Sequence, residues 1–208
     1  MSTSGSARTH ARSLLAANAT LHCLTGCAIG EILGLMIGTA MGLSSGVTIA
    51  LAVGLAFLFG YALSTLSLLE AGLSFLPALK VVFAADTLSI GVMELVDNVV
   101  MALIPGAMDA GLVNPLFWVG MMLALAAAFL AAFPVNRYLI DRGKGHALTH
   151  QHHLGGDHDE QRMDTKSLAA GVIGFLLGGL VVSIAAEIEK DDSPPPAHGA
   201  GVHRVLVR

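Results

Sequence analysis

Charged residues are scarce in this chain of 208 residues, because Asp, Glu, Lys and Arg together make up only 12% of it. A soluble domain typically carries about 25%, so the chain has too little polar surface for a soluble monomer. Two cysteines are too few for a disulfide scaffold. A net charge of −4 argues against a partnership with nucleic acid. These shortages exclude a soluble globular domain, a disulfide-stabilised fold and a nucleic-acid-binding protein.

Hydrophobic residues are abundant instead, at 54% of the chain, and they are gathered in long blocks. Five blocks can cross a bilayer core of about 30 Å as helices. They cover residues 21–43, 46–69, 78–104, 115–136 and 167–186. We therefore expect an all-α integral membrane bundle of about five transmembrane helices in contact with the lipid bilayer. A cytoplasmic N-terminal segment (1–20) would precede the bundle (21–186), and a disordered tail (187–208) would follow it.

Basic residues are unevenly distributed between the links that join these blocks. Links 44–45 and 105–114 contain no Lys or Arg. The other side of the predicted membrane carries Arg8, Arg12, Lys80, Arg137, Arg142, Lys144, Arg162 and Lys166. Since short cytoplasmic loops are enriched in Lys and Arg, we expect a multi-pass protein of a bacterial cytoplasmic membrane. Its N-terminus would lie in the cytoplasm and its C-terminus outside.

Acidic residues inside the apolar blocks are the strongest functional signal. Glu31 lies in the first block, and Asp86, Glu94 and Asp97 lie in the third, with Asn98 beside the last. A charge inside a bilayer costs about 2.5–3.5 kcal/mol on insertion scales, and no basic residue lies in the block interiors to pair with these acids. They must be protonated, face water or meet a cation, unless Asp86 and Asp97 simply reach interfacial water at the block ends.

Helical geometry places the acids of the third block on one stripe. At about 100° and 1.5 Å per residue, Asp86, Met93, Glu94 and Asp97 lie within one face over about 16 Å of helix. A stripe of this length is typical of a path or of two sites rather than a single point.

The first block combines thiols, an imidazole and an acid. Cys23, Cys27 and Glu31 follow each other at intervals of four and share one helical face, while His22 lies at the predicted helix start, where the chain can turn. Thiolate and imidazole groups bind copper(I), zinc and iron, although cysteines in membranes also serve as small packing residues. Leu24–Cys27 also fits a lipoprotein cleavage box, but polar residues interrupt the apolar region that a signal peptide needs.

A glycine ridge runs along the same block, at every fourth residue: Gly26, Gly30, Gly34, Gly38 and Gly42. Such ridges let a second helix approach closely, so we expect tight packing here. A sliding surface or a contact between copies in a homo-oligomer are the alternatives. Gly174 and Gly178 give the last block a weaker version.

The link at 141–166 is rich in histidine. It carries His146, His150, His152, His153 and His158. A His-rich tract is typical of modest metal affinity, so we expect a secondary, metal-buffering loop on the cytoplasmic side. A solvated linker without this role is the alternative.

Two stretches resemble a family of small bacterial multi-pass membrane proteins classed as a domain of unknown function. They are His22-Cys-Leu-Thr-Gly-Cys-Ala-Ile-Gly-Glu31 and Asp86-Thr-Leu-Ser-Ile-Gly-Val-Met-Glu94-Leu-Val-Asp97-Asn98, supported by shorter motifs at 104–109 and 133–137. The resemblance covers roughly residues 20–153. It implies that Asp109 and Asn136 are motif positions as well, and it carries a loose association with copper handling.

The leading hypothesis is a non-enzymatic membrane protein that binds or transports a transition-metal cation, with copper or zinc favoured. Its predicted ligands are His22, Cys23, Cys27, Glu31, Asp86, Glu94, Asp97 and Asn98. One alternative is proton-coupled transport of another solute by the same acids. Another is a non-catalytic membrane subunit or assembly factor that packs through the glycine ridge.

Overall fold

A computed structural model describes residues 3–70, 72–142 and 165–192. The described residues form five α-helices and no strand. The helices are α1 (Thr3–Ala40), α2 (Ser45–Glu70), α3 (Phe75–Leu103), α4 (Pro115–Asp141) and α6 (Thr165–Asp192). Each contains a stretch that is long and apolar enough to cross a membrane. The predicted all-α, multi-pass membrane bundle is therefore confirmed.

Local sequence signals end and begin the helices. Gly42, which has a φ of 63°, follows α1, and the next N–H, of Leu43, donates to the carbonyl of Gly38 at 2.9 Å. This glycine-dependent C-cap turns the chain directly into α2. Before α4, the Asn114 side chain accepts a hydrogen bond from the N–H of Leu116 at 2.9 Å and caps the helix.

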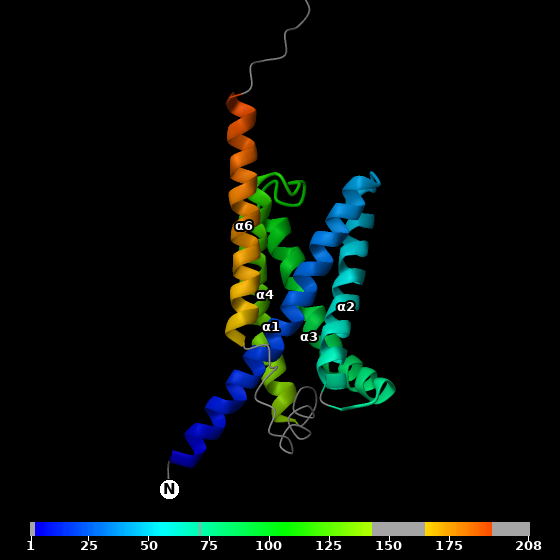
Figure 1. Cartoon of the computed structure of the whole chain (residues 1–208), viewed down its shortest axis with the longest axis vertical. Helices are drawn as coiled ribbons and strands as arrows, with labels where there is room; N and C mark the ends of the chain where they lie inside the picture. Colours follow the sequence, from blue (N-terminus) through cyan, green and yellow to red (C-terminus); the bar gives the residue numbers. More distant parts are fainter. Residues whose placement is uncertain (1–2, 71, 143–164, 193–208) are drawn as a thin grey trace, which may run out of the picture.

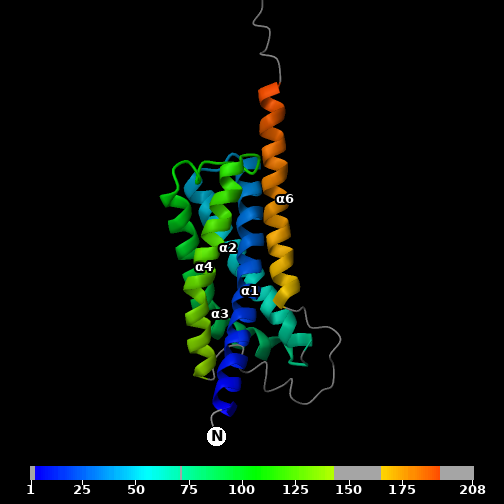
Figure 2. The ribbon, with the colours of Figure 1, turned by 90° about the vertical axis from the view of Figure 1, so that its left-hand side faces the viewer.

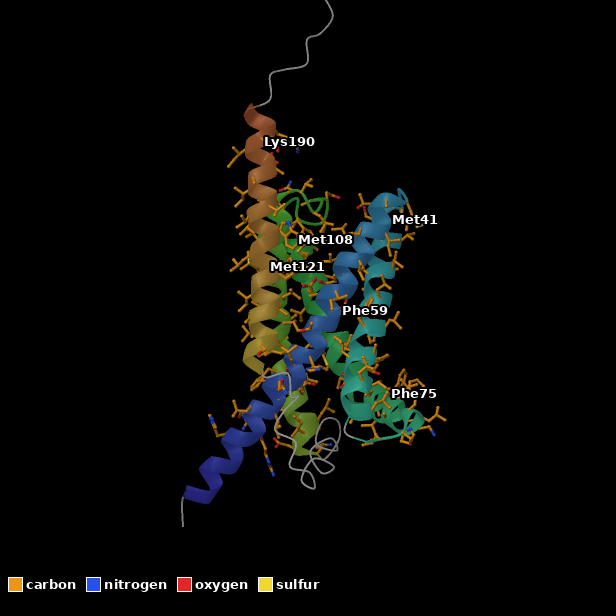
Figure 3. The ribbon with its side chains drawn as sticks, in the orientation of Figure 1. Met41, Phe59, Phe75, Met108, Met121 and Lys190 are labelled. Carbon is orange, nitrogen blue, oxygen red and sulfur yellow. The ribbon has the colours of Figure 1, made fainter. Side chains whose placement is uncertain are left out.

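The first helix is the centre of the bundle. α1 packs against α2, α3, α4 and α6, and Figures 1 and 2 show α6 along the outside, with its C-terminal end extending past the other helices. In the most apolar stretch of α1, 56% of the residues are buried, against 11% in α2 and 17% in α6. α2 and α6 therefore turn much of their apolar surface outward, and Figure 3 shows exposed side chains such as Phe75 and Met41 pointing away from the bundle.

The glycine ridge of α1 packs against α2 of the same chain. A Cβ atom added at Gly30 would lie 2.2 Å from the backbone nitrogen of Ala56, and one added at Gly26 would lie 2.6 Å from the Cα atom of Gly60. Gly34 and Gly38 meet α2 equally closely. The predicted tight packing is therefore observed. α2 therefore covers the ridge from Gly26 to Gly38, whereas Gly42 lies exposed in the turn after α1.

Two predicted boundaries differ from the structure. α1 begins at Thr3, its apolar span begins at Arg12, and Ala16 and Thr20 are buried in the bundle, so residues 3–20 are one continuous helix with the first apolar block. No proline interrupts this region, and elongating an existing helix is easier than starting one. α6 continues to Asp192, with an ion pair of 3.7 Å between Lys190 Nζ and Glu187 Oε2. Residues 187–192 are thus helical and not part of a disordered tail.

The two ends of the bundle differ in charge. One end contains the start of α1, the α2–α3 link and the end of α4 (Figure 1). There Arg12 pairs with Asp141 at 3.2 Å, and Arg137 donates to the Ser13 hydroxyl at 2.8 Å. The opposite end contains the 41–44 hairpin, the 104–114 link and the end of α6. The predicted histidine loop, from His146 to His158, lies outside the described residues.

Candidate cation site

α1 and α3 bring the two predicted polar stripes together. Cys23 interacts with Asp86 and Ser89, Cys27 with Glu94, and Glu31 with Asp97. Because the residue numbers rise together along both helices, α1 and α3 are parallel at this contact. We call this set the thiol–carboxyl row: Cys23, Cys27, Glu31, Asp86, Glu94 and Asp97.

The row is buried and central in the membrane-spanning stretches. The exposed fractions are 1–2% for the two cysteines, 1% for Asp86, 4% for Glu94 and Asp97, and 9% for Glu31. The midpoint of the Arg12–Ala40 span is residue 26, and that of the Phe75–Leu103 span is residue 89. Asp86 and Asp97 are therefore buried between helices and lie inside the apolar span rather than at its ends.

Three carboxyl groups of the row, those of Glu31, Glu94 and Asp97, have few hydrogen-bond partners among the described residues. Neither oxygen of Glu94 has a hydrogen-bond partner among the described residues, and one oxygen each of Glu31 and Asp97 also lacks one. No Lys or Arg occurs between residues 13 and 79 or between 81 and 136. A buried charge is costly unless it is paired. The row is thus suited to hold either protons or a positively charged ligand.

Two serines that were not predicted as site residues flank the Cys23 sulfur. Ser64 of α2 and Ser89 of α3 both lie close enough to interact with it. Their geometry falls short of a full hydrogen bond, and neither hydroxyl has another partner in the described part of the chain. Ser64 could have been found from its spacing, since it continues an α2 row of small residues at every fourth position: Thr48, Ala52, Ala56 and Gly60.

Polar contacts continue from the row toward the α1 start and α4. The side-chain nitrogen of Asn136 donates to the Thr20 hydroxyl at 2.9 Å, and both residues are buried. The side-chain oxygen of Asn18 is also buried and has no described partner. The family resemblance pointed to Asn136, whereas nothing in the spacing identified Thr20 or Asn18.

Apolar side chains close the opposite side of the row. One helical turn beyond Asp97, Met101 is buried. A Cβ atom added at Gly120 of α4 would lie 3.0 Å from the Met101 sulfur and 3.3 Å from the Cβ atom of Ala107. The polar contacts are therefore asymmetric. They extend toward the end of the bundle that contains the α1 start, whereas apolar side chains follow Asp97 toward the opposite end.

The other two predicted ligands lie beside the row. His22 is half-buried well inside α1, so the prediction that it occupies a helix start is wrong. The reason is that the helix extends through the polar residues before it. Asn98 donates its side-chain N–H to the backbone oxygen of Glu94 at 2.9 Å, and this bond ties it to its own helix.

The predicted ligands share one helix interface without converging on one point. In residues 3–70, 72–142 and 165–192, no group of three or more His, Cys, Asp and Glu residues is arranged to hold a metal ion. The chemistry of the donors still suits a cation, because thiols favour soft metals and carboxylates neutralise positive charge. The arrangement is a series of paired contacts along two helices, as the stripe of about 16 Å in α3 predicts.

Comparison with known families places this site in a defined part of the chain. A family model described as a domain of unknown function (DUF4396) matches residues 14–145. The chain belongs to this family. The DUF4396 match contains the whole thiol–carboxyl row and ends before His146 and α6. No curated protein and no solved structure matches the chain. Membership in DUF4396 confirms the resemblance to an uncharacterised family.

Proposed function

We propose that the protein binds a transition-metal cation within the membrane and transports it, with copper and zinc as the candidate ions. The observation that carries the proposal is the thiol–carboxyl row. It combines soft and negatively charged donors, buried well inside two apolar helices, and no Lys or Arg lies in residues 13–79 or 81–136. Ionisable groups at such positions are expensive, and they typically mark ion pathways.

The proposal gives the side chains distinct roles. Cys23 and Cys27 supply sulfur ligands, while Glu31, Glu94 and Asp97 neutralise the positive charge as the ion moves along α1 and α3. The contacts around Thr20 extend the path toward the end of the bundle that carries Arg12 and Arg137. The histidines between residues 146 and 158, which follow α4 in the sequence, would receive the ion.

Metal uptake into proteoliposomes that contain the purified protein tests this function. We expect Glu94→Gln and Cys27→Ser each to reduce uptake of copper or zinc at least about tenfold, the usual scale for a lost interaction with a charged group. Asp109→Asn is the matched control, because Asp109 is exposed in the 104–114 link. Uptake that remains at the wild-type rate in both Glu94→Gln and Cys27→Ser would contradict the proposal, provided that both variants stay monodisperse.

Proton-coupled transport of another solute is the second candidate, and the contact between Glu31 and Asp97 favours it. Their carboxyl groups interact directly, and two adjoining carboxyl groups readily share one proton. Replacing both cysteines with serine separates the candidates. Proton-coupled transport predicts that pH-driven solute uptake survives in this variant, whereas metal transport predicts that uptake is lost.

A further inference from the structure

Cys23 and Cys27 form a pair of sulfur atoms whose spacing suits a bridging metal ion. Both are unoxidised and buried, and Cβ atoms at this helical spacing lie about 5–6 Å apart. That separation is too long for a disulfide, which needs about 3.5–4.5 Å. Two thiolate–metal bonds of about 2.3 Å each span about 4.6 Å in line. Because this span is close to the Cβ separation, rotation about the two Cα–Cβ bonds can bring both sulfur atoms to a single metal ion.

The number of ligands distinguishes between classes of metal. A structural zinc ion takes four ligands and a catalytic zinc ion takes three from the protein, and the described residues contain no such group. A soft monovalent ion, copper(I) or silver(I), is satisfied by two thiolates in a linear arrangement, and soft ligands select it. The geometry of the pair matches this class.

The serines beside Cys23 provide an independent indication that its sulfur binds a ligand. Two other hydroxyls in the membrane helices bond to their own backbone: Thr25 donates to Leu21 at 2.8 Å and Ser183 to Leu180 at 2.8 Å. Thr65 of α2 is buried without a described partner as well, so the position of the serines beside Cys23 carries more weight than their missing bonds. Ser64 and Ser89 are only 2% and 0% exposed, yet both lack such a bond. Their hydroxyls flank the Cys23 sulfur instead. A metal-bound thiolate would accept from both, as a stronger, charge-assisted acceptor than a thiol.

We infer that Cys23 and Cys27 form a two-coordinate site for a soft monovalent metal cation, with the Ser64 and Ser89 hydroxyls positioning the Cys23 thiolate. The inference rests on the proposed function and narrows its ion to the class of copper(I) and silver(I). On binding, two S–H bonds break, two sulfur–metal bonds form, and two protons pass to the aqueous phase. No oxidation state changes.

Silver(I) binding to the full-length protein in detergent tests the site, because silver(I) is stable in air. We expect the wild type to retain one silver ion per chain after desalting, in the presence of a tenfold excess of zinc. Cys23→Ser and Cys27→Ser should each weaken silver binding at least 100-fold. The double variant Ser64→Ala/Ser89→Ala should weaken it about tenfold, the scale of a lost supporting contact around a metal ligand. Ser183→Ala is the matched control and should bind as the wild type does.

Thiol protection in the wild type provides a second readout that needs no variant to fold. Silver(I) should block the labelling of both cysteines by a membrane-permeant maleimide, as measured by mass spectrometry, and zinc should not. Full labelling in the presence of silver, or equal protection by zinc, would overturn the inference. Binding by the Ser64→Ala/Ser89→Ala variant equal to that of Ser183→Ala would overturn the role of the hydroxyls. If silver(I) binds but no metal is taken up, the proposed transport is contradicted and the two-coordinate site is not. If zinc is taken up but silver(I) does not bind, only the two-coordinate site is contradicted.

Discussion

Those polar side chains in the membrane helices that form hydrogen bonds fall into two groups, according to whether the bond stays within one helix or joins two. Thr25 bonds only to its own helix, to Leu21. Thr20 bonds to its own helix through Ala16, and it also accepts from Asn136 of α4. Only the second kind of contact fixes how two helices sit against each other. The Thr20–Asn136 bond therefore positions α4 beside the thiol–carboxyl row.

We predict that the Thr20–Asn136 bond contributes to the free energy of unfolding through a coupling between the two side chains. Hydrogen bonds between membrane helices contribute about 0.6 kcal/mol on average and up to about 1.7 kcal/mol. A double-mutant cycle of Thr20→Val and Asn136→Leu, measured by unfolding in mixed micelles, should give a coupling in this range. The same cycle with Thr25→Val in place of Thr20→Val should give none. Equal couplings in both cycles would show that the Thr20 bond does not join the helices.

The sequence identifies some residues of the site and not others, for a physical reason. Glu31, Glu94 and Asp97 stand out because charge is rare in an apolar helix. Ser64 does not stand out, because serine is common in membrane helices and usually bonds to its own backbone. Its missing backbone bond and its position beside Cys23 are evident only from the structure.

Helix faces are predictable from spacing, but their partners are not. The glycine ridge indicates that some helix approaches α1 closely, and the structure assigns that position to α2. In the same way, the stripes of α1 and α3 are each evident from the sequence, while their parallel contact is not. The choice of partner depends on how complementary surfaces meet, which one sequence does not reveal. Two chain boundaries were also missed, because helices continue beyond the apolar residues.

We predict that a single methyl group on the glycine ridge destabilises the bundle. In Gly30→Ala, the new Cβ atom would overlap the backbone of Ala56, at 2.2 Å from its nitrogen. The helices would have to separate, at a cost of about 1–3 kcal/mol in the free energy of unfolding. Gly174→Ala in α6 is the matched control, because nothing lies within 4 Å of its Cβ position.

Thermal unfolding in detergent measures both substitutions. The control should change the free energy of unfolding by no more than about 0.5 kcal/mol, as is usual away from packed sites. If Gly30→Ala is as stable as Gly174→Ala, the close approach of α1 and α2 is not required for stability.

At the scale of the whole molecule, the site belongs to the four helices that the DUF4396 model matches, and α6 is added outside them. α6 packs against α4 where Gly179 meets Trp118, since a Cβ atom there would lie 2.4 Å from the indole ring. α6 supplies none of the six members of the thiol–carboxyl row. Its C-terminal end, at Asp192, lies at the end of the bundle opposite to the start of α1, as Figure 1 shows.

The distribution of charge over the two ends of the bundle predicts the orientation of the protein in its membrane. Arg12, Lys80 and Arg137 all belong to the end that contains the α1 start, whereas links 41–44 and 104–114 contain no Lys or Arg. Because basic loops stay in the cytoplasm, we expect the N-terminus inside and the C-terminus outside. A fluorescent protein fused to the N-terminus should therefore fluoresce. The same fluorescent protein fused to the C-terminus should be exported and stay dark.

Alkaline phosphatase, which is active only outside the cytoplasm, should give the opposite pattern at both ends. Fusions truncated after residue 43 and after residue 142 extend the measurement to the interior of the chain, and they should place these points outside and inside, respectively. In the control, three lysines are added to the 104–114 link, which opposes the natural charge bias. They should reduce the activity of a phosphatase that is fused at that link. A fluorescent C-terminal fusion together with a dark N-terminal fusion would contradict this orientation, because α1 begins and α6 ends at opposite ends of the bundle. The end that carries Arg12 and Arg137 would then face away from the cytoplasm, and the contacts around Thr20 and Asn136 would lie toward the outer side.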